Sequence, residues 1–180
     1  MYLKHIYLSG GAYEDLQYLC GRIRGVVDVT AGQIILESES DDVGQEMRFG
    51  ISIRYNPKYM DLSTLFDTIY AVVNPYAQTK EGEMPKGIYY DSLEDEPQIE
   101  YYINFLNSRG REPLVSNACI TVNDPMPQER GVRRCQIEVG RIHHFSPLEE
   151  NAQYRDTTPP AKSSIDYAGL FAAGIIERPA

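Results

Sequence analysis

The chain has 180 residues, 42% of them hydrophobic, and a net charge of −9, a composition typical of a globular domain and not of a disordered chain. The acidic balance argues against nucleic acid or an anionic membrane as the main partner. No apolar run is long enough to span a bilayer, and the strand-like start has no signal-peptide core, so we expect a cytoplasmic protein. The three cysteines lack CxxC spacing, so we expect neither a disulfide framework nor a zinc site.

The first third of the chain carries alternating strand and helix patterns. A helix is expected to start near Tyr13, because apolar residues recur at the i, i+3, i+4 and i+7 spacing, and to end at Gly25. The acidic, polar stretch 37–44 is expected to form a loop between two strands. The strands of this part are expected at residues 3–8, 26–30 and 48–55.

The remaining elements follow from capping and breaking residues as well as from periodicity. Asp61 is placed to cap a second helix, which Asn74-Pro75 breaks, and the polar stretch 76–86 is expected to form a loop. A third helix carries an apolar stripe from Ile99 to Leu106. Further strands are expected at residues 88–90, 114–122 and 132–140, followed by an irregular tail from Pro147.

The order of these elements, β-α-β-β-α-β-α-β-β, indicates the fold class. Its first six elements match the split βαβ plan of ferredoxin-like domains. Helices packed against a mixed sheet make an α+β protein. The sequence therefore predicts a two-layer α+β sandwich with a ferredoxin-like βαββαβ core, extra strands and an irregular C-terminal tail.

Several segments in chain order resemble the peptide methionine sulfoxide reductase A (MsrA) family. The turn after the first strand, Gly11-Ala12-Tyr13-Glu14-Asp15, resembles the family's Gly-Cys-Phe-Trp-Gly, and Arg24-Gly25-Val26 resembles its Pro-Gly-Val. The other matching segments are Tyr55-Asn56-Pro57, Leu62–Phe66, Asn74-Pro75, Gly87-Ile88-Tyr89, Ile137-Glu138-Val139 and Phe145–Glu150. The resemblance implies an MsrA-like domain over residues 1–154 and a C-terminal tail over 155–180, packed on that domain or extending from it.

In the MsrA family a cysteine thiolate at a helix start attacks the sulfoxide sulfur. A glutamic acid and two tyrosines hold and protonate the sulfoxide oxygen, and Phe and Trp hold the substrate methyl group. In this chain the nucleophile position is Ala12, which has no lone pair to donate. Tyr13 replaces the Phe, and Glu14 puts a charge where the Trp would form an apolar wall.

The remaining family positions also differ in this chain. Counting back from Tyr55, the family glutamate falls on Phe49, and Glu46 reaches that place only with an insertion and a bulge. No cysteine follows Cys135, so the usual recycling thiol is missing. The resemblance thus places the site at Ala12, with Glu46 as a catalytic candidate. The pocket positions that it implies are Gly11, Tyr13, Glu14, Phe49 and Tyr89.

Other reactive residues have simpler structural explanations. Cys20, eight residues after Ala12, lies on the apolar side of the first helix and is expected in the core, as are Cys119 and Cys135. His143 and His144 are adjacent on a strand, where neighbours point to opposite faces, so we expect poor co-ligands and no metal site.

Hypotheses of different classes remain open at this stage. The first is a divergent MsrA-like protein, peptide-methionine (S)-S-oxide reductase-like, which needs no cofactor and has lost its thiol-based reduction with the cysteine. The second is a non-catalytic module that binds a peptide, including one that contains methionine sulfoxide, or a small ligand at the old pocket. A third is an interaction surface on the tail Tyr167–Ile176.

Overall fold

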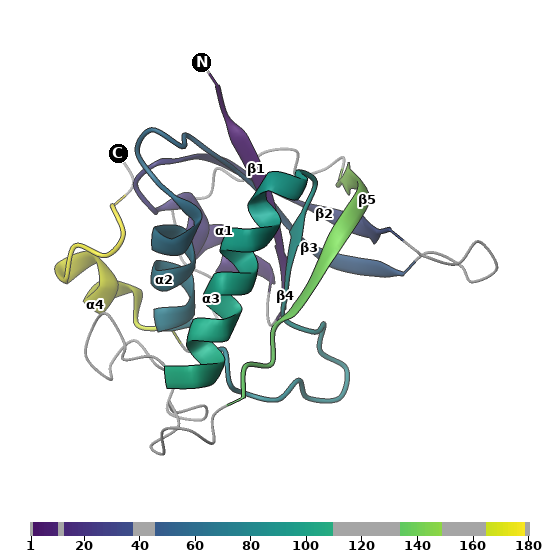
Figure 1. Cartoon of the computed structure of the whole chain (residues 1–180). Coiled ribbons are helices and arrows are strands. Elements are labelled where there is room, and N and C mark those ends of the chain that lie inside the picture. The colour runs from purple at the N-terminus through teal and green to yellow at the C-terminus, as the bar shows by residue number, and fades with distance from the viewer. Residues whose placement is uncertain (1, 11–12, 38–45, 110–133, 149–164, 179–180) are drawn as a thin grey trace.

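The structure, a computed structural model, describes residues 2–10, 13–37, 46–109, 134–148 and 165–178. Its strands are β1 (Lys4–Ser9), β2 (Val26–Leu36), β3 (Met47–Tyr55), β4 (Gly87–Tyr90) and β5 (Glu138–Pro147) (Figure 1). Its helices are α1 (Tyr13–Gly21), α2 (Leu62–Val72), the 3-10 turn η1 (Leu93–Asp95), α3 (Glu96–Arg109) and α4 (Tyr167–Ala172). No helix in these ranges has both the length and the apolar character to cross a bilayer.

The five strands form a closed barrel in the order β1-β3-β2-β5-β4, and β4 pairs back onto β1. All pairs are antiparallel except β4 with β5, so the predicted α+β class and mixed sheet are confirmed. The prediction of a plain two-layer sandwich is wrong. Register shifts near Val26 of β2 and near His143 of β5 add local twist to these strands. Strand β5 pairs with both β2 and β4, so the sheet closes on itself.

One face of the barrel wall packs against the helices, and we call it the helix-covered face. Directly paired residues point to the same side of a sheet, and Leu8 pairs with both Ile51 and Ile88. These three side chains are fully buried in one core with residues of all four α-helices, including Leu19, Phe66, Ile99 and Leu170. Burial of this apolar surface against the helices is therefore the main force that holds the helices on the barrel.

The opposite face, which we call the inner face, carries a second and smaller apolar cluster. Its buried members are Tyr7, Ile34, Tyr89 and Ile142. Gly32 and Gly50 pair with each other on this face. A Cβ added to Gly32 would lie 2.4 Å from the Ser146 carbonyl oxygen, so this part of the barrel requires a residue without a side chain.

The N-terminal two-thirds of the described chain largely follows the predicted elements. Asp61 caps α2 as expected, because its Oδ1 accepts a hydrogen bond of 2.7 Å from the Thr64 N–H. The predicted end of the first helix is wrong: α1 ends at Gly21, and Gly25, with φ +97°, lies just before β2 instead. The strand predicted at 26–30 runs to Leu36, because β2 pairs with β3 and β5 along this length.

The C-terminal part differs more from the prediction. The last strand is β5 over 138–147 and not 132–140, since it needs both β4 and β2 as partners. The strand predicted at 114–122 lies outside the described residues, as does Cys119. The expected irregular tail contains α4, whose Leu170 is fully buried in the main core.

Candidate functional site at the end of the first strand

The turn between β1 and α1 is shaped by one glycine. Gly10 has φ +121°, a backbone conformation that favours glycine, and a Cβ added there would lie 2.7 Å from the Lys86 Cα. The next two residues, Gly11 and Ala12, lie outside the described residues, so the predicted nucleophile position has no described geometry. Tyr13 begins α1, and Glu14 in the first helical turn is exposed.

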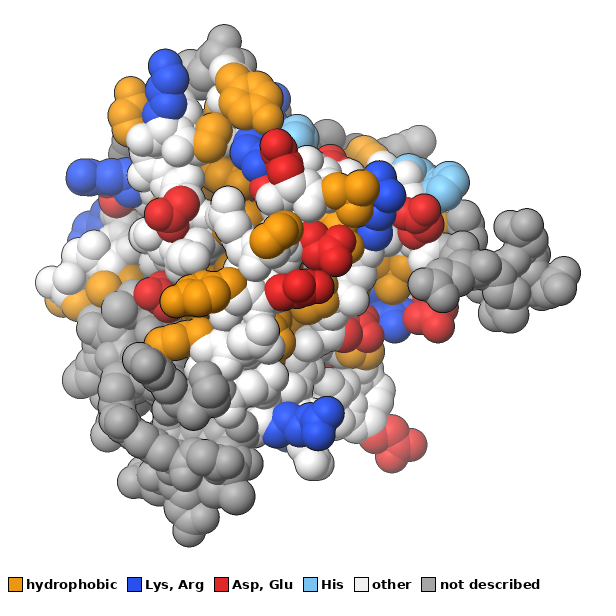
Figure 2. All heavy atoms as spheres, in the orientation of Figure 1, with side chains coloured by type: hydrophobic (Ala, Val, Ile, Leu, Met, Phe, Trp, Pro, Cys, Tyr) orange, Lys and Arg blue, Asp and Glu red, His pale blue; other side chains and the backbone are white. Residues whose placement is uncertain are grey.

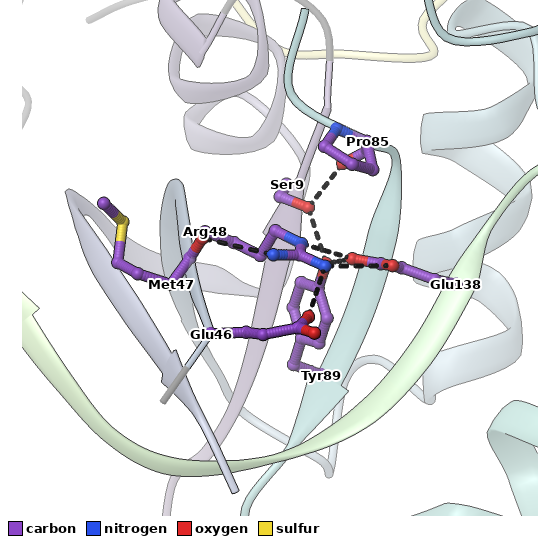
Figure 3. Close-up of polar contacts among 7 residues, drawn as sticks. All are labelled: Ser9, Glu46, Met47, Arg48, Pro85, Tyr89 and Glu138. Carbon is purple, nitrogen blue, oxygen red and sulfur yellow. Dashed lines mark hydrogen bonds and ion pairs between the residues drawn. The ribbon is translucent and has the colours of Figure 1, made fainter. Parts of the chain in front are cut away.

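A cluster of polar side chains lies on the inner face at the end of β1 (Figure 3). Gly87 of β4 pairs with both Ser9 of β1 and Glu138 of β5. A Cβ added to Gly87 would lie 2.0 Å from the Tyr89 hydroxyl oxygen, so the Tyr89 ring folds over the space that this glycine leaves. The phenol thereby reaches Glu138, to which it donates a hydrogen bond, and lies 3.0 Å from the Ser9 Oγ.

Arg48 of β3 completes this group, which we call the polar cluster. Its Nε donates to Oε1 of Glu138 at 2.6 Å, and its Nη2 lies 3.4 Å from the other carboxylate oxygen. The same Nη2 donates to Glu46 at 2.9 Å. Figure 3 shows the Arg48 guanidinium between the two carboxylates. The Ser9 hydroxyl donates to the Pro85 carbonyl at 2.7 Å, so the polar cluster joins four strands, β1, β3, β4 and β5, to the loop before β4.

The charges within the polar cluster determine which groups donate protons. Partial burial raises the pKa of Glu138, but the hydrogen bonds from Arg48 and Tyr89 and the Arg48 charge outweigh it and lower this pKa overall. Burial, together with the bond to Glu138, raises the pKa of Tyr89. At neutral pH Glu138 is therefore an ionised acceptor and Tyr89 a neutral donor.

The structure brings some of the predicted site residues together and separates others. Glu46 and Tyr89 are linked through Arg48 and Glu138. Phe49, which follows Arg48 in β3, points to the other face of the barrel wall, because neighbouring side chains alternate along a strand. Phe49 and Tyr89 are thus on opposite sides of the sheet.

Sequence reasoning did not identify three members of the polar cluster: Ser9, Arg48 and Glu138. Alternation along β3 already places Arg48 and Glu46 on one side, but only the register of β1, β4 and β5 brings Glu138 to that side. The available signal was the pair of opposite charges, Arg48 and Glu138, on two predicted strands. Such a pair is expected to find a partner within the barrel.

The described cysteines are poorly suited to nucleophilic chemistry. Cys20 is fully buried in the main core, as predicted, and burial raises the pKa of its thiol. Cys135 is partly buried, and burial raises its pKa as well. A nucleophilic cysteine at neutral pH needs a lowered pKa, so neither of these two thiols has the character of a catalytic nucleophile.

The two adjacent histidines differ from the sequence prediction. The expectation that His143 and His144 point to opposite faces is wrong, because their Nδ1 atoms lie 3.1 Å apart. A register shift in the pairing of β5 with β2 at this point interrupts the regular alternation. Within the residues that the structure describes, no group of three or more His, Cys, Asp and Glu side chains forms a candidate metal site.

Comparison with known proteins supports the fold but no closer relationship. No family model matches the chain. The structure is similar to Mxr1 from Saccharomyces cerevisiae in an unusual oxidized form, with a TM-score of 0.56 and 17% identity over 82% of this chain and 77% of that chain. It is similar to the reduced form of Mxr1 with a TM-score of 0.56 and 15% identity, over 84% and 82% of the two chains. Mxr1 is an MsrA, so this similarity shows that the protein has an MsrA-like fold.

Proposed function

We propose that this protein with an MsrA-like fold does not reduce methionine sulfoxide through a thiol. We propose that it acts instead as a non-catalytic module that binds a peptide or small ligand, with methionine-sulfoxide-containing peptides as the first candidates. The observation that carries the proposal is the polar cluster, in which Arg48 keeps Glu138 ionised. An ionised carboxylate has no proton to donate, so Glu138 does not act as the acid that a departing sulfoxide oxygen requires.

The thiols support the same proposal. Reduction of a sulfoxide by this route needs a reactive thiolate, and Ala12 stands where the family resemblance places that thiol. Cys20 lies two helical turns further along α1, inside the main core, and its thiol has a raised pKa. A substitute nucleophile at Cys20 would therefore need local opening of the core.

A binding role is supported by the ordered frame around the β1–α1 turn. Ser9 and Tyr89 are buried and hydrogen-bonded to each other directly before the turn. Gly10 packs tightly against Lys86, whose Nζ donates to the Ala77 carbonyl at 2.9 Å. A rigid frame lowers the entropic cost of ordering a bound ligand, which favours binding even where the chemistry is absent.

The proposed absence of thiol-based reduction is tested by an activity assay with dabsyl-methionine-S-sulfoxide and dithiothreitol. We expect no turnover by the unsubstituted protein, and turnover would contradict the proposal. The Ala12→Cys variant is the matched control, because it restores the thiol without touching the polar cluster. Turnover by this variant alone would support a pocket that still binds the sulfoxide.

The proposed binding of a peptide is tested by thermal unfolding with a methionine-sulfoxide peptide and with the same peptide carrying methionine. A ligand that binds the native state raises the melting temperature, so we expect a rise with the sulfoxide peptide. The rise should be lost in Tyr13→Ala and kept in Tyr101→Ala, whose side chain is exposed on α3. No rise with either peptide, or an equal rise in both variants, would refute binding at the turn.

A further inference from the structure

The strand β5 contains an extra residue where it pairs with β2. Ile35 of β2 pairs with His144, and the next residue, Leu36, pairs with Ile142, so two residues of β2 oppose three of β5. This is a β-bulge at His143, and bulges change the direction of nearby side chains. His143 and His144 are both exposed, and Figure 2 shows histidine side chains in pale blue at the surface on the side of β5.

The two imidazole rings face each other through the same nitrogen atom. Their Nδ1 atoms lie 3.1 Å apart, and the ring planes are inclined by 73°. In a neutral pair one Nδ1 carries a hydrogen and the other accepts it. When that hydrogen moves through solvent to Nε2 of its own ring, two Nδ1 lone pairs lie side by side and no net proton is lost.

The two nitrogens lie close enough for both to reach a single metal ion once the exposed rings turn. With metal–nitrogen distances of about 2.0–2.1 Å, nitrogens 3.1 Å apart correspond to an N–metal–N angle of about 100°. This angle lies between those of square-planar and tetrahedral coordination. The ring centroids are 5.4 Å apart, so the nitrogens now point nearly at each other, and coordination requires the exposed rings to turn.

We propose that His143 and His144 form a two-histidine site for a divalent late transition metal ion of the class that prefers imidazole, such as Zn²⁺ or Cu²⁺. The proposal goes beyond the binding function above and does not depend on it. Water completes the coordination shell, since no third His, Cys, Asp or Glu among the described residues joins the pair. The site is open and on the surface, which suits reversible uptake of an ion and not a structural role.

The affinity test is calorimetric titration of the full chain with Zn²⁺ and then with Cu²⁺. Two imidazoles held together bind one ion far more tightly than either does alone, so His143→Ala and His144→Ala should each weaken binding by about tenfold or more. His5→Ala is the matched control, because His5 is exposed and is the remaining histidine of the chain. It should change the affinity by less than about twofold.

A spectroscopic readout identifies the coordinating atoms. Two-bond ¹H–¹⁵N correlation spectra report each imidazole nitrogen separately, so Zn²⁺ should shift Nδ1 of His143 and His144 and leave His5 unchanged. Loss of less than about threefold in affinity in both single variants, or an equal shift at His5, would overturn the proposal and indicate adventitious binding by single histidines. The substituted residues are exposed, so both variants are expected to fold.

Discussion

The two faces of the barrel wall use different interactions. On the helix-covered face, Ile6, Leu8, Ile51, Ile53 and Ile88 are fully buried against helices. On the inner face, apolar Tyr7 and Ile34 share the space with the polar cluster around Arg48 and Glu138. The first face is stabilised by non-directional burial, whereas the second depends on hydrogen bonds whose partners must stay in position.

This difference shows which face of the barrel wall can hold charged side chains. A charged residue within the helix-covered core would lose its hydration and would need a charged or hydrogen-bonding partner to compensate for that loss. The inner face already holds an ion pair beside the β1–α1 turn, the place where the MsrA resemblance puts the site. Three substitutions test the comparison, in order from the largest expected effect to the smallest.

The largest effect is expected from truncation of an aromatic residue under the helices. Phe66 of α2 is fully buried and contacts the Tyr102 ring of α3 with centroids 5.4 Å apart. Phe66→Ala should lower the free energy of unfolding by about 3–5 kcal/mol, because it removes apolar contacts and leaves a cavity. Tyr101→Ala, on the exposed side of α3, is the control and should change it by less than about 0.5 kcal/mol in urea unfolding. Similar losses of unfolding free energy in both variants would contradict the conclusion that apolar burial stabilises the helix-covered face.

The second test concerns a charge pair on the helix-covered side whose carboxylate is buried. Lys4 of β1 donates a hydrogen bond to Asp95 of η1, whose side chain is 1% exposed. Lys4→Met should lower the free energy of unfolding by about 3 kcal/mol, because it leaves Asp95 buried without its counter-charge. The control Arg24→Met removes a pair with Glu177 that is exposed on both sides and should cost less than about 1 kcal/mol.

Recovery in a double variant separates this explanation from a general packing defect. Lys4→Met combined with Asp95→Leu should be more stable than Lys4→Met alone, since the uncompensated charge is gone. If the double variant shows the sum of two independent losses in urea unfolding, the pair is not what stabilises this contact.

The smallest effect is expected on the inner face and depends on pH. Arg48→Met removes the cation that lowers the pKa of Glu138 below its ordinary value of 4.5. A lowered pKa in the folded state stabilises the protein above the unfolded pKa, and this stability is lost as pH falls through the folded pKa. At neutral pH the variant should therefore be less stable by about 1–2 kcal/mol, a value reduced for the partial exposure of Glu138.

The pH dependence and a matched variant test this interpretation. The difference between wild type and Arg48→Met should shrink as pH falls below 4.5. Glu46→Gln removes the charge of the second, exposed carboxylate that Arg48 binds, and should cost about 0.5 kcal/mol or less. A difference between wild type and Arg48→Met that stays constant from about pH 7 to about pH 3 would contradict a stabilising role for ionised Glu138.

Local signals predicted those elements whose partners lie close in sequence. Asp61 and the apolar face of α2 were evident because a cap and a 3.6-residue period act within the helix itself. Cys20 was placed in the core for the same reason. The end of α1 was less predictable: the chain leaves the helix at Gly21 and uses Gly25 before β2, and both glycines fit the local rule for a helix end.

The candidate site was only partly predictable, because its members come from four separate segments. Tyr89 and Glu46 were expected, but their link through Arg48 and Glu138 depends on the barrel register. Whether Ala12 lies in a pocket with Tyr13 and Phe49 stays a prediction, since Ala12 is outside the described residues.

The sequence by itself determined the α+β class, most helix positions and the absence of a cysteine at position 12, because composition and periodicity are local properties of the chain. Tertiary structure decided the closure of the barrel, the polar cluster and the approach of His143 to His144. Each of these depends on which residues of distant strands face each other, and a shift of one residue in that register would move every side chain of the strand to the opposite face.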